Sequence, residues 1–525
     1  MTAPGHTTSA NTADRIARDR PDEIALIGPG SGARLSYAQT EAAIQARAAA
    51  LAAQVGRGQA VGLLAQNSPE WLIAFYAIQR TGAVAVPIST KLPPEAVREL
   101  VEVSRLSLLL TDQRDDVGRR LAPDGLLPRA DLAAPVPPAS FHTAAVRADD
   151  DAMVLFTSGS TGLPKGVRLS HHSHSWVSDQ LAVPAAPGAA RVLIAAPLYH
   201  MNALSNSQRA LLAGATAVIL PRFEPADYLA AISTYRITRL SGVAPMFELL
   251  LQRPDLIAGR DLSSVQEIYL GSAPAATGLF PRLRATFPEA VIKHGFGTTE
   301  SGPVVFGPDR DARPTPDGSV GVAHPAVQIR LVDPGGAVSE HRGVLEVRSP
   351  ALMSGYHHRP DLTPPITSDG FHHTGDIFEV RDGFYFFIGR EDDMFVSGGE
   401  NIYPRAVEQV LEVHPAVREA VVVPIPDPIK GRKPAAFVTL RPGHEATETQ
   451  LREHVLSRFE PYAHPRRVWV LAELPLTGAN KADRAALIAR AAELSSPGAG
   501  GSPSSPRPSA PPGPQQWPPA AGSAG

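Results

Sequence analysis

VLFTSGSTGLPKGVRLSH, from Val154 to His171, is the stretch that decides how this chain is interpreted. Its apolar start, Val154 to Phe156, predicts a short strand, and the residues after it are almost all Thr, Ser, Gly, Pro and Lys. Glycines let main-chain N–H groups approach an anion closely, while hydroxyl groups and a lysine add donors and positive charge. The stretch therefore predicts a loop that binds nucleotide phosphates. The candidate contacts are Thr157, Ser158, Gly159, Ser160, Thr161, Gly162 and Lys165.

The spacing within this loop excludes the P-loop pattern of nucleotide binding. A P-loop requires Gly directly before Lys and Ser or Thr directly after it, whereas Pro164 precedes Lys165 here and Gly166 follows it. The composition alone is also typical of an exposed surface loop. The phosphate-binding interpretation therefore depends on other stretches of the chain.

Length and composition limit the fold and the location. The chain has 525 residues, of which 43% are hydrophobic and 19% are charged, and its net charge is −3. This length predicts two or more domains of about 100 to 200 residues each, and the charge gives no general attraction to nucleic acid or anionic membranes. Cysteine is absent, which excludes disulfides and thiolate metal sites and fits a reducing cytoplasm. With neither a signal peptide nor a long apolar run, the sequence predicts a cytoplasmic protein without an integral membrane segment.

Strands and helices alternate along the first part of the chain. Ala60–Leu64 and Val84–Pro87 are apolar runs typical of buried strands, and Pro69–Arg80 between them is a predicted helix. A second series of this kind runs from Arg191 to Gly295, and the alternation predicts parallel sheets covered by helices. Short strands with alternating polarity from Gly318 to Ile388 predict an antiparallel subdomain.

We therefore expect an α/β fold in two domains. Residues 12–390 are predicted to form a large N-terminal domain of stacked α/β sheets plus a small antiparallel β subdomain. Residues 391–490 are predicted to form a small, mobile α+β C-terminal domain. Pro, Gly, Ser and Ala dominate residues 495–525, which cannot bury enough apolar surface to offset chain ordering and are predicted to be disordered.

Several predicted strands of the second series end in small or polar residues. Ligands of open parallel sheets bind beyond the carboxyl ends of the strands, so these ends predict a nucleotide and substrate site. They comprise Gly242, Gly271, Ser272, Ala273, His294, Gly295, Phe296 and Gly297. By contrast, we expect the cluster of His171, His172 and His174 at an exposed helix start and not at a metal site.

The loop from Val154 to His171 resembles, nearly letter for letter, the phosphate loop of the adenylate-forming enzymes. This superfamily contains acyl-CoA synthetases, firefly-luciferase-like ligases and the adenylation domains of peptide synthetases. The resemblance extends, in the same order, over most of residues 20 to 490. It includes GFGTTES (295–301), HTGD (373–376), GREDDMFVSGGENIYPRAVE (389–408) and PLTGANKADR (475–484).

The resemblance implies roles for residues around the nucleotide. Glu300, with Thr161, would contact Mg²⁺, and Thr298 and Thr299 lie in the segment that contacts adenine and phosphate. Hard oxygen ligands suit Mg²⁺, which usually takes one or two protein carboxylates beside phosphate and water. Phe296 replaces the family's usual aromatic hydroxyl, a change that stacking on adenine tolerates.

The same resemblance assigns the ribose contacts and the moving parts. Asp376 would accept both ribose hydroxyls, and Arg390 would contact ribose or phosphate. Asp392 corresponds to the hinge, and Ser397, Gly398 and Gly399 to the loop that lies along the pantetheine arm of coenzyme A. Lys481 would reach the substrate carboxylate and α-phosphate, although Asn480 stands where the family commonly has Gly.

The implied function is an ATP-dependent ligase that forms an acyl adenylate and then a coenzyme A thioester, with ATP, Mg²⁺ and coenzyme A as cofactors. Such a ligase needs no side-chain nucleophile, which fits the absence of cysteine. A pocket without an obvious cation favours an aromatic or medium-chain aliphatic monocarboxylate. The predicted pocket consists of Tyr199, His200, Asn202, Gly242, Val243, Met246 and Gly271.

Two other functions fit the same residues. The acyl group would pass to the phosphopantetheine of a carrier protein in one, and the chain would be a catalytically silent acyl- or nucleotide-binding protein in the other. Lys481, Glu300 and Asp376 argue against the silent protein, because each belongs to the implied chemistry. The sequence leaves the oligomeric state open, a homodimer included.

Overall fold

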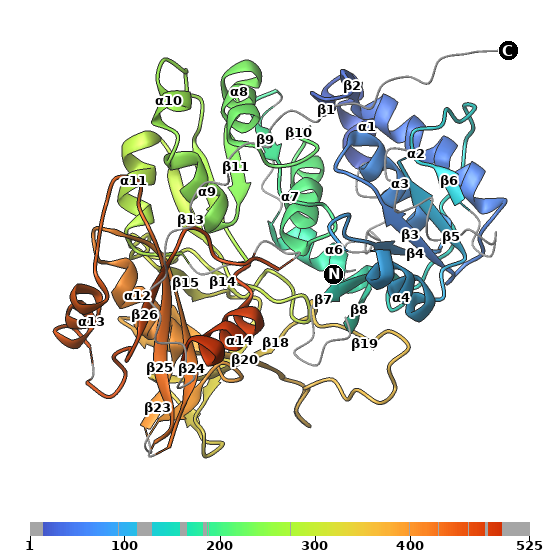
Figure 1. Ribbon diagram of the computed structural model, residues 1–525. Helices are drawn as coiled ribbons and strands as arrows, with labels where there is room; N and C mark the ends of the chain where they lie inside the picture. The colour runs from blue at the N-terminus through green and yellow to red at the C-terminus, as the bar shows by residue number, and fades with distance from the viewer. Residues whose placement is uncertain are drawn as a thin grey trace, which may run out of the picture.

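The computed structural model describes residues 14–92, 94–112, 129–157, 165–181, 186, 188–272, 275–397, 400–428, 430–459, 461–477 and 481–495 (Figure 1). Three seven-stranded sheets form the larger part of the molecule, and a two-stranded and a three-stranded sheet follow near the C-terminus. The large part is α/β with one antiparallel sheet, as the sequence predicts. No helix in the described ranges is long and apolar enough to cross a bilayer.

The first sheet carries the strand ends that the sequence marks as a site. Its strands are parallel except for β2, which pairs antiparallel with β1. Helices α6 (His171–Leu181), α7 (Met201–Leu212), α8 (Pro225–Tyr235), α9 (Ala244–Leu251), α10 (Pro254–Ile257) and α11 (Leu279–Thr286) belong to this half. In spatial order the strands are β13 (Val291–His294), β12 (Glu267–Leu270), β11 (Arg239–Gly242), β9 (Arg191–Ile194), β10 (Thr216–Ile219), β1 (Ile24–Gly28) and β2 (Ala33–Ser36).

The second sheet carries the phosphate-loop stretch. β7 and β8 form an antiparallel hairpin at one side of a parallel set of strands. Residues 158–164, between these two strands, lie outside the described part of the chain. In spatial order the strands are β19 (Gly355–Tyr356), β8 (Lys165–Ser170), β7 (Asp151–Thr157), β4 (Val84–Pro87), β3 (Ala60–Leu64), β5 (Leu108–Thr111) and β6 (Arg129–Asp131).

Helix α3 (Pro69–Arg80) packs at the centre of the largest hydrophobic core. Pro69 fits the first helical position, and the Ser68 hydroxyl caps the helix by accepting from Trp71 N at 3.1 Å. Almost every residue of α3 is buried, and α3 shares one core with side chains of both parallel sheets. Helices α1 (Asp14–Asp19), α2 (Tyr37–Ala52) and α4 (Pro94–Ser104) complete this half of the molecule.

The third sheet is antiparallel, as expected. Its strands β20 and β21 are joined by a tight turn in which Asp382 and Gly383 both have positive φ, at 52° and 83°. This is the backbone of a type I′ turn, whose twist matches that of a hairpin. In spatial order the strands are β14 (Phe306–Gly307), β15 (Ser319–Ala323), β21 (Phe384–Arg390), β20 (His372–Arg381), β18 (Arg342–Arg348), β16 (Gln328–Val332) and β17 (Val338–Ser339).

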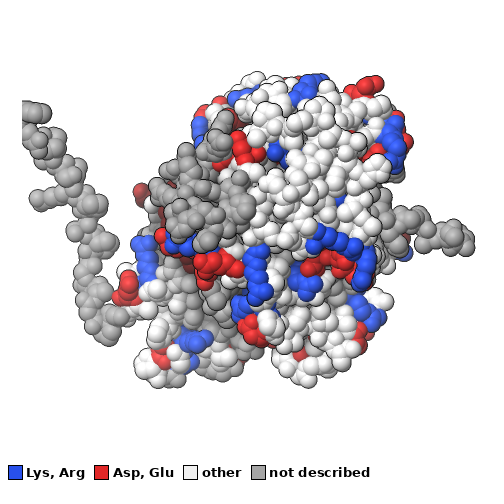
Figure 2. Space-filling view, turned by 90° about the vertical axis from the view of Figure 1, so that its right-hand side faces the viewer, with Lys and Arg blue, Asp and Glu red and all other residues white. Residues whose placement is uncertain are grey.

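The C-terminal part, orange to red in Figure 1, has hydrophobic clusters of its own. Strand β24 pairs antiparallel with β25, which pairs parallel with β26. The elements are β22 (Phe395–Ser397), β23 (Glu400–Ile402), α12 (Pro404–Glu412), β24 (Val417–Asp427), β25 (Gly431–Leu440), α13 (Glu448–Leu456), β26 (Val468–Leu471) and α14 (Arg484–Ser495). On the face shown in Figure 2, acidic and basic side chains lie in mixed groups, in keeping with a net charge of −3.

The structure corrects three expectations. His171 and His174 begin helix α6 as predicted, but both are buried, so the expectation of an exposed surface is wrong. Burial lowers the pKa of His171 to about 4 and that of His174 to about 3, which keeps both rings neutral. Strand β6 lies in a stretch interpreted as a connection, and α14 extends to Ser495, the first residue of the predicted disordered tail. Residues 496–525 lie outside the described part of the chain.

Candidate active site

Three neighbouring strands of the first sheet end side by side. Gly271 N donates to Gly242 O at 3.0 Å, and Gly295 N donates to Leu270 O at 2.8 Å, so the segments after β11, β12 and β13 leave the sheet side by side. A Cβ atom at position 295 would collide with the Tyr269 hydroxyl. The small residues at these strand ends therefore let neighbouring side chains such as Tyr269 lie close to the backbone.

Ser272 has a backbone conformation that costs energy. Its φ is +61°, in the left-handed region that a residue with a Cβ adopts at a cost of about 1–2 kcal/mol. It directly follows Gly271 and is exposed at the start of the predicted nucleotide loop. Ala273, the next predicted contact, lies outside the described residues.

The segment after β13 forms a fixed turn. Thr298 Oγ1 accepts from Ser301 N at 3.0 Å and lies 2.9 Å from Ser301 Oγ, and this brings Thr299 and Glu300 to the tip. Gly297 is required here because a Cβ would strike Pro303 and the Gly302 carbonyl. The turn therefore holds the predicted metal carboxylate in place through main-chain geometry.

Aromatic and histidine side chains support the base of this turn. The Phe296 ring stands edge-on to Phe378, with centroids 4.9 Å apart, and one part of it remains accessible. His294 Nδ1 lies 3.2 Å from Ser319 O, and its ring contacts Phe280 with centroids 5.9 Å apart. These contacts anchor the predicted adenine segment to the antiparallel sheet and to α11.

Asp376 is a buried carboxylate on β20, an interior strand of the antiparallel sheet. It is directly opposite Arg390 in the β20–β21 register, and Arg390 Nη1 donates to its Oδ1 at 2.9 Å. Burial, opposed by Arg390 and assisted by Glu300, raises the pKa of Asp376 to about 6. A buried carboxylate with accepting capacity left over suits a ligand that brings hydroxyl donors.

Lys481 reaches the same place from the C-terminal part. Lys481 is exposed, and partial desolvation by neighbouring segments lowers its pKa despite attraction to Asp376 and Glu300. The turn before it is closed by Thr477 N donating to Lys481 O at 2.7 Å. Arg484 anchors the following helix by donating to Val422 O and Glu408 Oε1, at 2.7 Å and 2.6 Å.

The residues predicted to line the acyl pocket lie near the carboxyl ends of the strands of the first sheet. His200 precedes α7, and burial together with Lys481 and Lys91 lowers the pKa of its ring to about 4. Its Nε2 and Asn202 Nδ2 are both buried and find no hydrogen-bond partner among the described residues. A Cβ at Gly271 would lie 3.1 Å from Asn202 Nδ2, which places that amide over the strand end.

Other members complete this pocket. Tyr199 is buried with its ring 4.7 Å from that of His200, and Gly242 leaves room for Met246, whose Cε would lie 3.2 Å from a Cβ there. Val243 caps helix α9 beside them. The predicted pocket residues themselves include no cation, but Lys91 and Lys481, from outside that set, interact electrostatically with His200.

Sequence reasoning missed three residues of the site. Lys91 follows the carboxyl end of β4, Tyr269 lies on β12 against Gly271 and Gly295, and Tyr356 lies on β19. Burial and Glu300 raise the pKa of Tyr356, and Lys165 Nζ lies 5.8 Å from its ring centroid. A polar residue after a buried strand was the signal available for Lys91; the other two depend on tertiary packing.

Thr157 and Lys165 flank the phosphate loop. They face each other in the last pair of the β7–β8 hairpin, where Thr157 Oγ1 lies 3.5 Å from Lys165 O. The remaining predicted contacts lie outside the described residues. These are Ser158, Gly159, Ser160, Thr161 and Gly162.

The predicted hinge and thiol-facing loop follow β21. Asp392 is exposed, and its carboxylate lies 3.8 Å from Arg390 Nη2. Ser397 is buried and faces Glu400 across the β22–β23 hairpin, whose tip, Gly398 and Gly399, lies outside the described residues.

The donors present fit a magnesium ion that arrives with a nucleotide. The described residues contain no group of three or more His, Cys, Asp or Glu side chains that could hold a metal by themselves. The Glu300 carboxylate forms no hydrogen bond or ion pair within the described chain. Its charge contributes to raising the pKa values of Lys481 and Asp376, although desolvation lowers that of Lys481 overall. A single free carboxylate matches Mg²⁺, which completes its coordination with phosphate oxygens and water.

Both parts of the chain match known protein families. Residues 13–357 match the AMP-binding enzyme family, and residues 406–481 match the AMP-binding enzyme C-terminal domain. The chain is 32% identical to 4-coumarate–CoA ligase 2 of Oryza sativa subsp. japonica over 521 residues, which cover 91% of each chain. It is 33% identical to a feruloyl-CoA synthase of an Amycolatopsis species over 481 residues, covering 89% of this chain and 96% of that one.

A solved structure gives the same result. The crystal structure of the anthranilate CoA ligase AuaEII in complex with anthranoyl-AMP superimposes with a TM-score of 0.85 at 25% identity, covering 94% of this chain and 98% of that one. The order of motifs, the two-part match and this superposition agree along nearly the full length. The chain therefore belongs to the family of AMP-binding enzymes, in the adenylate-forming superfamily, and is of the AMP-forming acid–CoA ligase type.

Proposed function

We propose that this ligase activates a carboxylic acid with ATP and then transfers the acyl group to coenzyme A through one site used twice. The observation that supports the proposal is that Lys481, Asp376 and Glu300, from segments far apart in the sequence, lie close enough to interact electrostatically. In the first step, a carboxylate oxygen attacks the α-phosphorus and pyrophosphate leaves. In the second step, the thiol sulfur attacks the acyl carbon and AMP leaves.

The first step brings two anions together, so catalysis is mainly positioning and charge compensation. Lys481 supplies an ammonium group for the acid carboxylate and the α-phosphate. Asp376, fixed by Arg390, accepts the ribose hydroxyls. Mg²⁺, held by Glu300 and Thr161, would neutralise phosphate charge when bound with ATP. Thr157, Lys165 and the loop between them hold the departing pyrophosphate.

The second step needs Lys481 to leave and the tip of the β22–β23 hairpin to enter. We place the pivot at Asp392, so that residues 12–390 form the fixed domain and residues 391–490 the moving one. Two local features support this pivot. Asp392 is exposed, and the residue before it, Glu391, is hydrogen-bonded to the antiparallel sheet. One rotation would exchange the two sets of groups.

For the acid we propose an aromatic or medium-chain monocarboxylate. The support is a buried pocket of aromatic and apolar side chains, with polar atoms of His200 and Asn202 left to fix orientation. The relatives named for 4-coumarate, ferulate and anthranilate act on aromatic acids. We expect acids of this class to give the highest kcat/KM.

The test is ATP–pyrophosphate exchange with a panel of aromatic, aliphatic and dicarboxylic acids, followed by thioester formation with free coenzyme A. Exchange that depends on an aromatic or medium-chain acid, with transfer to coenzyme A, is expected. If exchange occurs and the acyl group passes to carrier-protein phosphopantetheine but not to coenzyme A, the acceptor is a carrier protein and not coenzyme A. Absence of acid-dependent exchange with every acid would contradict the proposal.

A further inference from the structure

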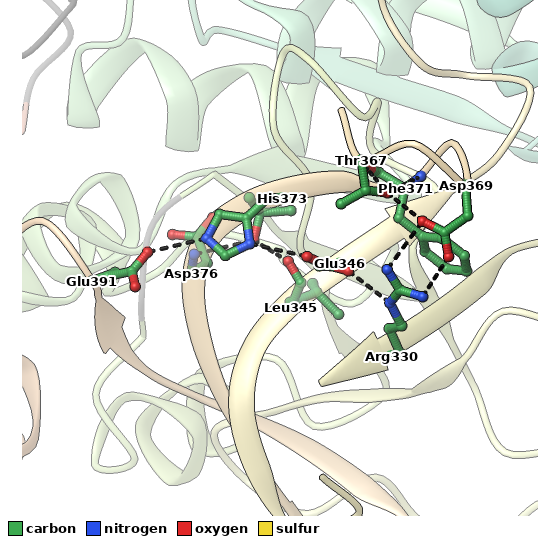
Figure 3. Close-up of polar contacts among 10 residues, drawn as sticks. Arg330, Leu345, Glu346, Thr367, Asp369, Phe371, His373, Asp376 and Glu391 are labelled. Carbon is green, nitrogen blue, oxygen red and sulfur yellow. Dashed lines mark hydrogen bonds and ion pairs between the residues drawn. The ribbon is translucent and has the colours of Figure 1, made fainter. Parts of the chain in front are cut away.

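A chain of charged side chains connects the antiparallel sheet to the predicted hinge (Figure 3). His373 lies at its centre on β20, where it faces Glu346 of β18 in the strand register. His373 Nδ1 lies 3.1 Å from Glu346 Oε1, and His373 Nε2 lies 3.1 Å from Glu391 Oε2. Glu391 is the residue directly before Asp392, so this chain ends at the pivot.

The far end of the chain is fixed. Arg330 of β16 donates from Nε to Glu346 Oε2 at 2.6 Å and from Nη1 to Asp369 at 2.7 Å, while its guanidinium lies 4.2 Å from the centroid of the Phe371 ring. Glu346 is buried, and a buried carboxylate needs hydrogen-bonding partners of this kind. One oxygen is used by Arg330 and the other is directed at His373.

Both ring nitrogens of His373 therefore face carboxylate oxygens. Carboxylates only accept hydrogen bonds, and a neutral imidazole has one N–H, whereas the imidazolium has two. Only the protonated ring satisfies Glu346 and Glu391 together. Desolvation opposes this charge, but the two carboxylates outweigh it and raise the pKa of His373. His372, the preceding residue of β20, also interacts electrostatically with His373, and burial lowers the pKa of His372.

Glu391 is held in two ways. Its N–H donates to Gly375 O at 2.7 Å, on strand β20 directly before Asp376, and its carboxylate contacts His373. The next residue, Asp392, has no comparably short contact, because its nearest ion pair is 3.8 Å long. The side chain and N–H of Glu391 are therefore both tied to the antiparallel sheet, whereas the Asp392 side chain has only this longer contact.

We propose that the His373 imidazolium is a positioning group that bridges Glu346 of the large domain and Glu391, the first residue of the moving part, and thereby favours the orientation that brings Lys481 into the site. The inference rests on the proposed two-step function. When the ring loses its proton, one of the two bridges is lost, Glu391 loosens, and the adenylating orientation is less populated. The rate of adenylation then falls, while bound substrate still meets the same contacts.

The test compares the pH profiles of kcat for ATP–pyrophosphate exchange in the wild type and in His373→Gln, between pH 6 and 9. Their ratio at each pH cancels every other titrating group. Because His373 and Glu391 are partly exposed, we expect a ratio of about two- to fivefold at low pH that approaches one at high pH. His373→Lys, which keeps a cation, should retain the low-pH rate across the range.

Further variants make the outcome decisive. Glu391→Gln should give the same loss as His373→Gln, and the double variant should lose no more than either alone. His444→Ala, at an exposed position of the C-terminal part, serves as the control with a ratio of one. A wild-type to His373→Gln ratio that does not change with pH would overturn the inference. Absence of exchange in the wild type would instead overturn the proposed function.

Discussion

Asp376 and Lys481 are proposed to act on the same site, but the fold holds them in opposite ways. Asp376 lies within strand β20, is buried, and has Arg390 opposite it in the sheet register. Lys481 lies on an exposed turn of the C-terminal part, anchored through Thr477 and Arg484 on either side. A group needed in both half-reactions can be part of a rigid sheet, whereas a group needed in one must be able to leave.

Lys481→Ala should produce the largest effect. Removing the ammonium group leaves the repulsion between carboxylate and triphosphate uncompensated, and adenylation should fall by about 100- to 1000-fold. Thioester formation from supplied acyl-AMP should stay within about twofold, since Lys481 has left the site by then. Single-turnover assays of each half-reaction measure this. Lys433→Ala on β25, in the same part of the chain, is the control.

Asp376→Asn should lower both half-reactions. The amide keeps its shape and can still accept from Arg390, but it loses the charge that favours ribose hydroxyls, so we expect about a tenfold loss in each. Measurement of kcat and KM for ATP, and of the KM for acyl-AMP in thioester formation, checks this. A loss confined to adenylation would make Asp376 resemble Lys481 and remove the contrast between them.

The same substitution should stabilise the protein near neutral pH. Burial raises the pKa of Asp376 from its ordinary value of 3.8 to about 6, so the folded state binds more protons than the unfolded state between these values. Stability is therefore lost as pH rises through about 6, and Asp376→Asn should recover about 1–3 kcal/mol at pH 7.5. Urea unfolding at pH 5 and 7.5 measures this. An equal effect at both pH values would contradict the assignment to ionised Asp376.

Removal of residues 496–525 should have the smallest effect. Helix α14 ends at Ser495, and Leu487 and Ala491 of this helix are already buried against β24 and β25. We expect kcat and KM within about 1.5-fold of the full chain, because Pro-rich, Gly-rich segments seldom bury apolar surface. A large loss of activity would show that residues after Lys481, in the removed segment, also contribute to the site.

Much of the fold was predictable because periodicity is strong in buried elements. The predicted bounds of β3, β4 and α3 agree with the structure, since each is an apolar run or amphipathic segment closed by turn residues. The strand ends at Gly242 and Gly271 could also be predicted from the sequence, because a glycine at such a position indicates that neighbouring side chains lie close to the backbone. Local chemistry was sufficient for these features.

The remainder depended on pairing between distant segments. Strand β8 lies within a Gly- and Ser-rich stretch and becomes a strand by pairing with β7 and β19. The contact between Glu346 and His373 requires a register shift between Val344 and Glu346, which no local pattern reveals. Burial of His171 and His174 likewise results from helices packed around them.

The most direct test of the account measures both half-reactions, side by side, for the wild type, Lys481→Ala and Asp376→Asn. Acid-dependent ATP–pyrophosphate exchange reports the first half-reaction, and thioester formation from supplied acyl-AMP reports the second. The account predicts that Lys481→Ala loses the first and keeps the second, while Asp376→Asn loses part of both. Equal losses of both half-reactions in Lys481→Ala would contradict the claim that the C-terminal part delivers its lysine for adenylation and then withdraws it.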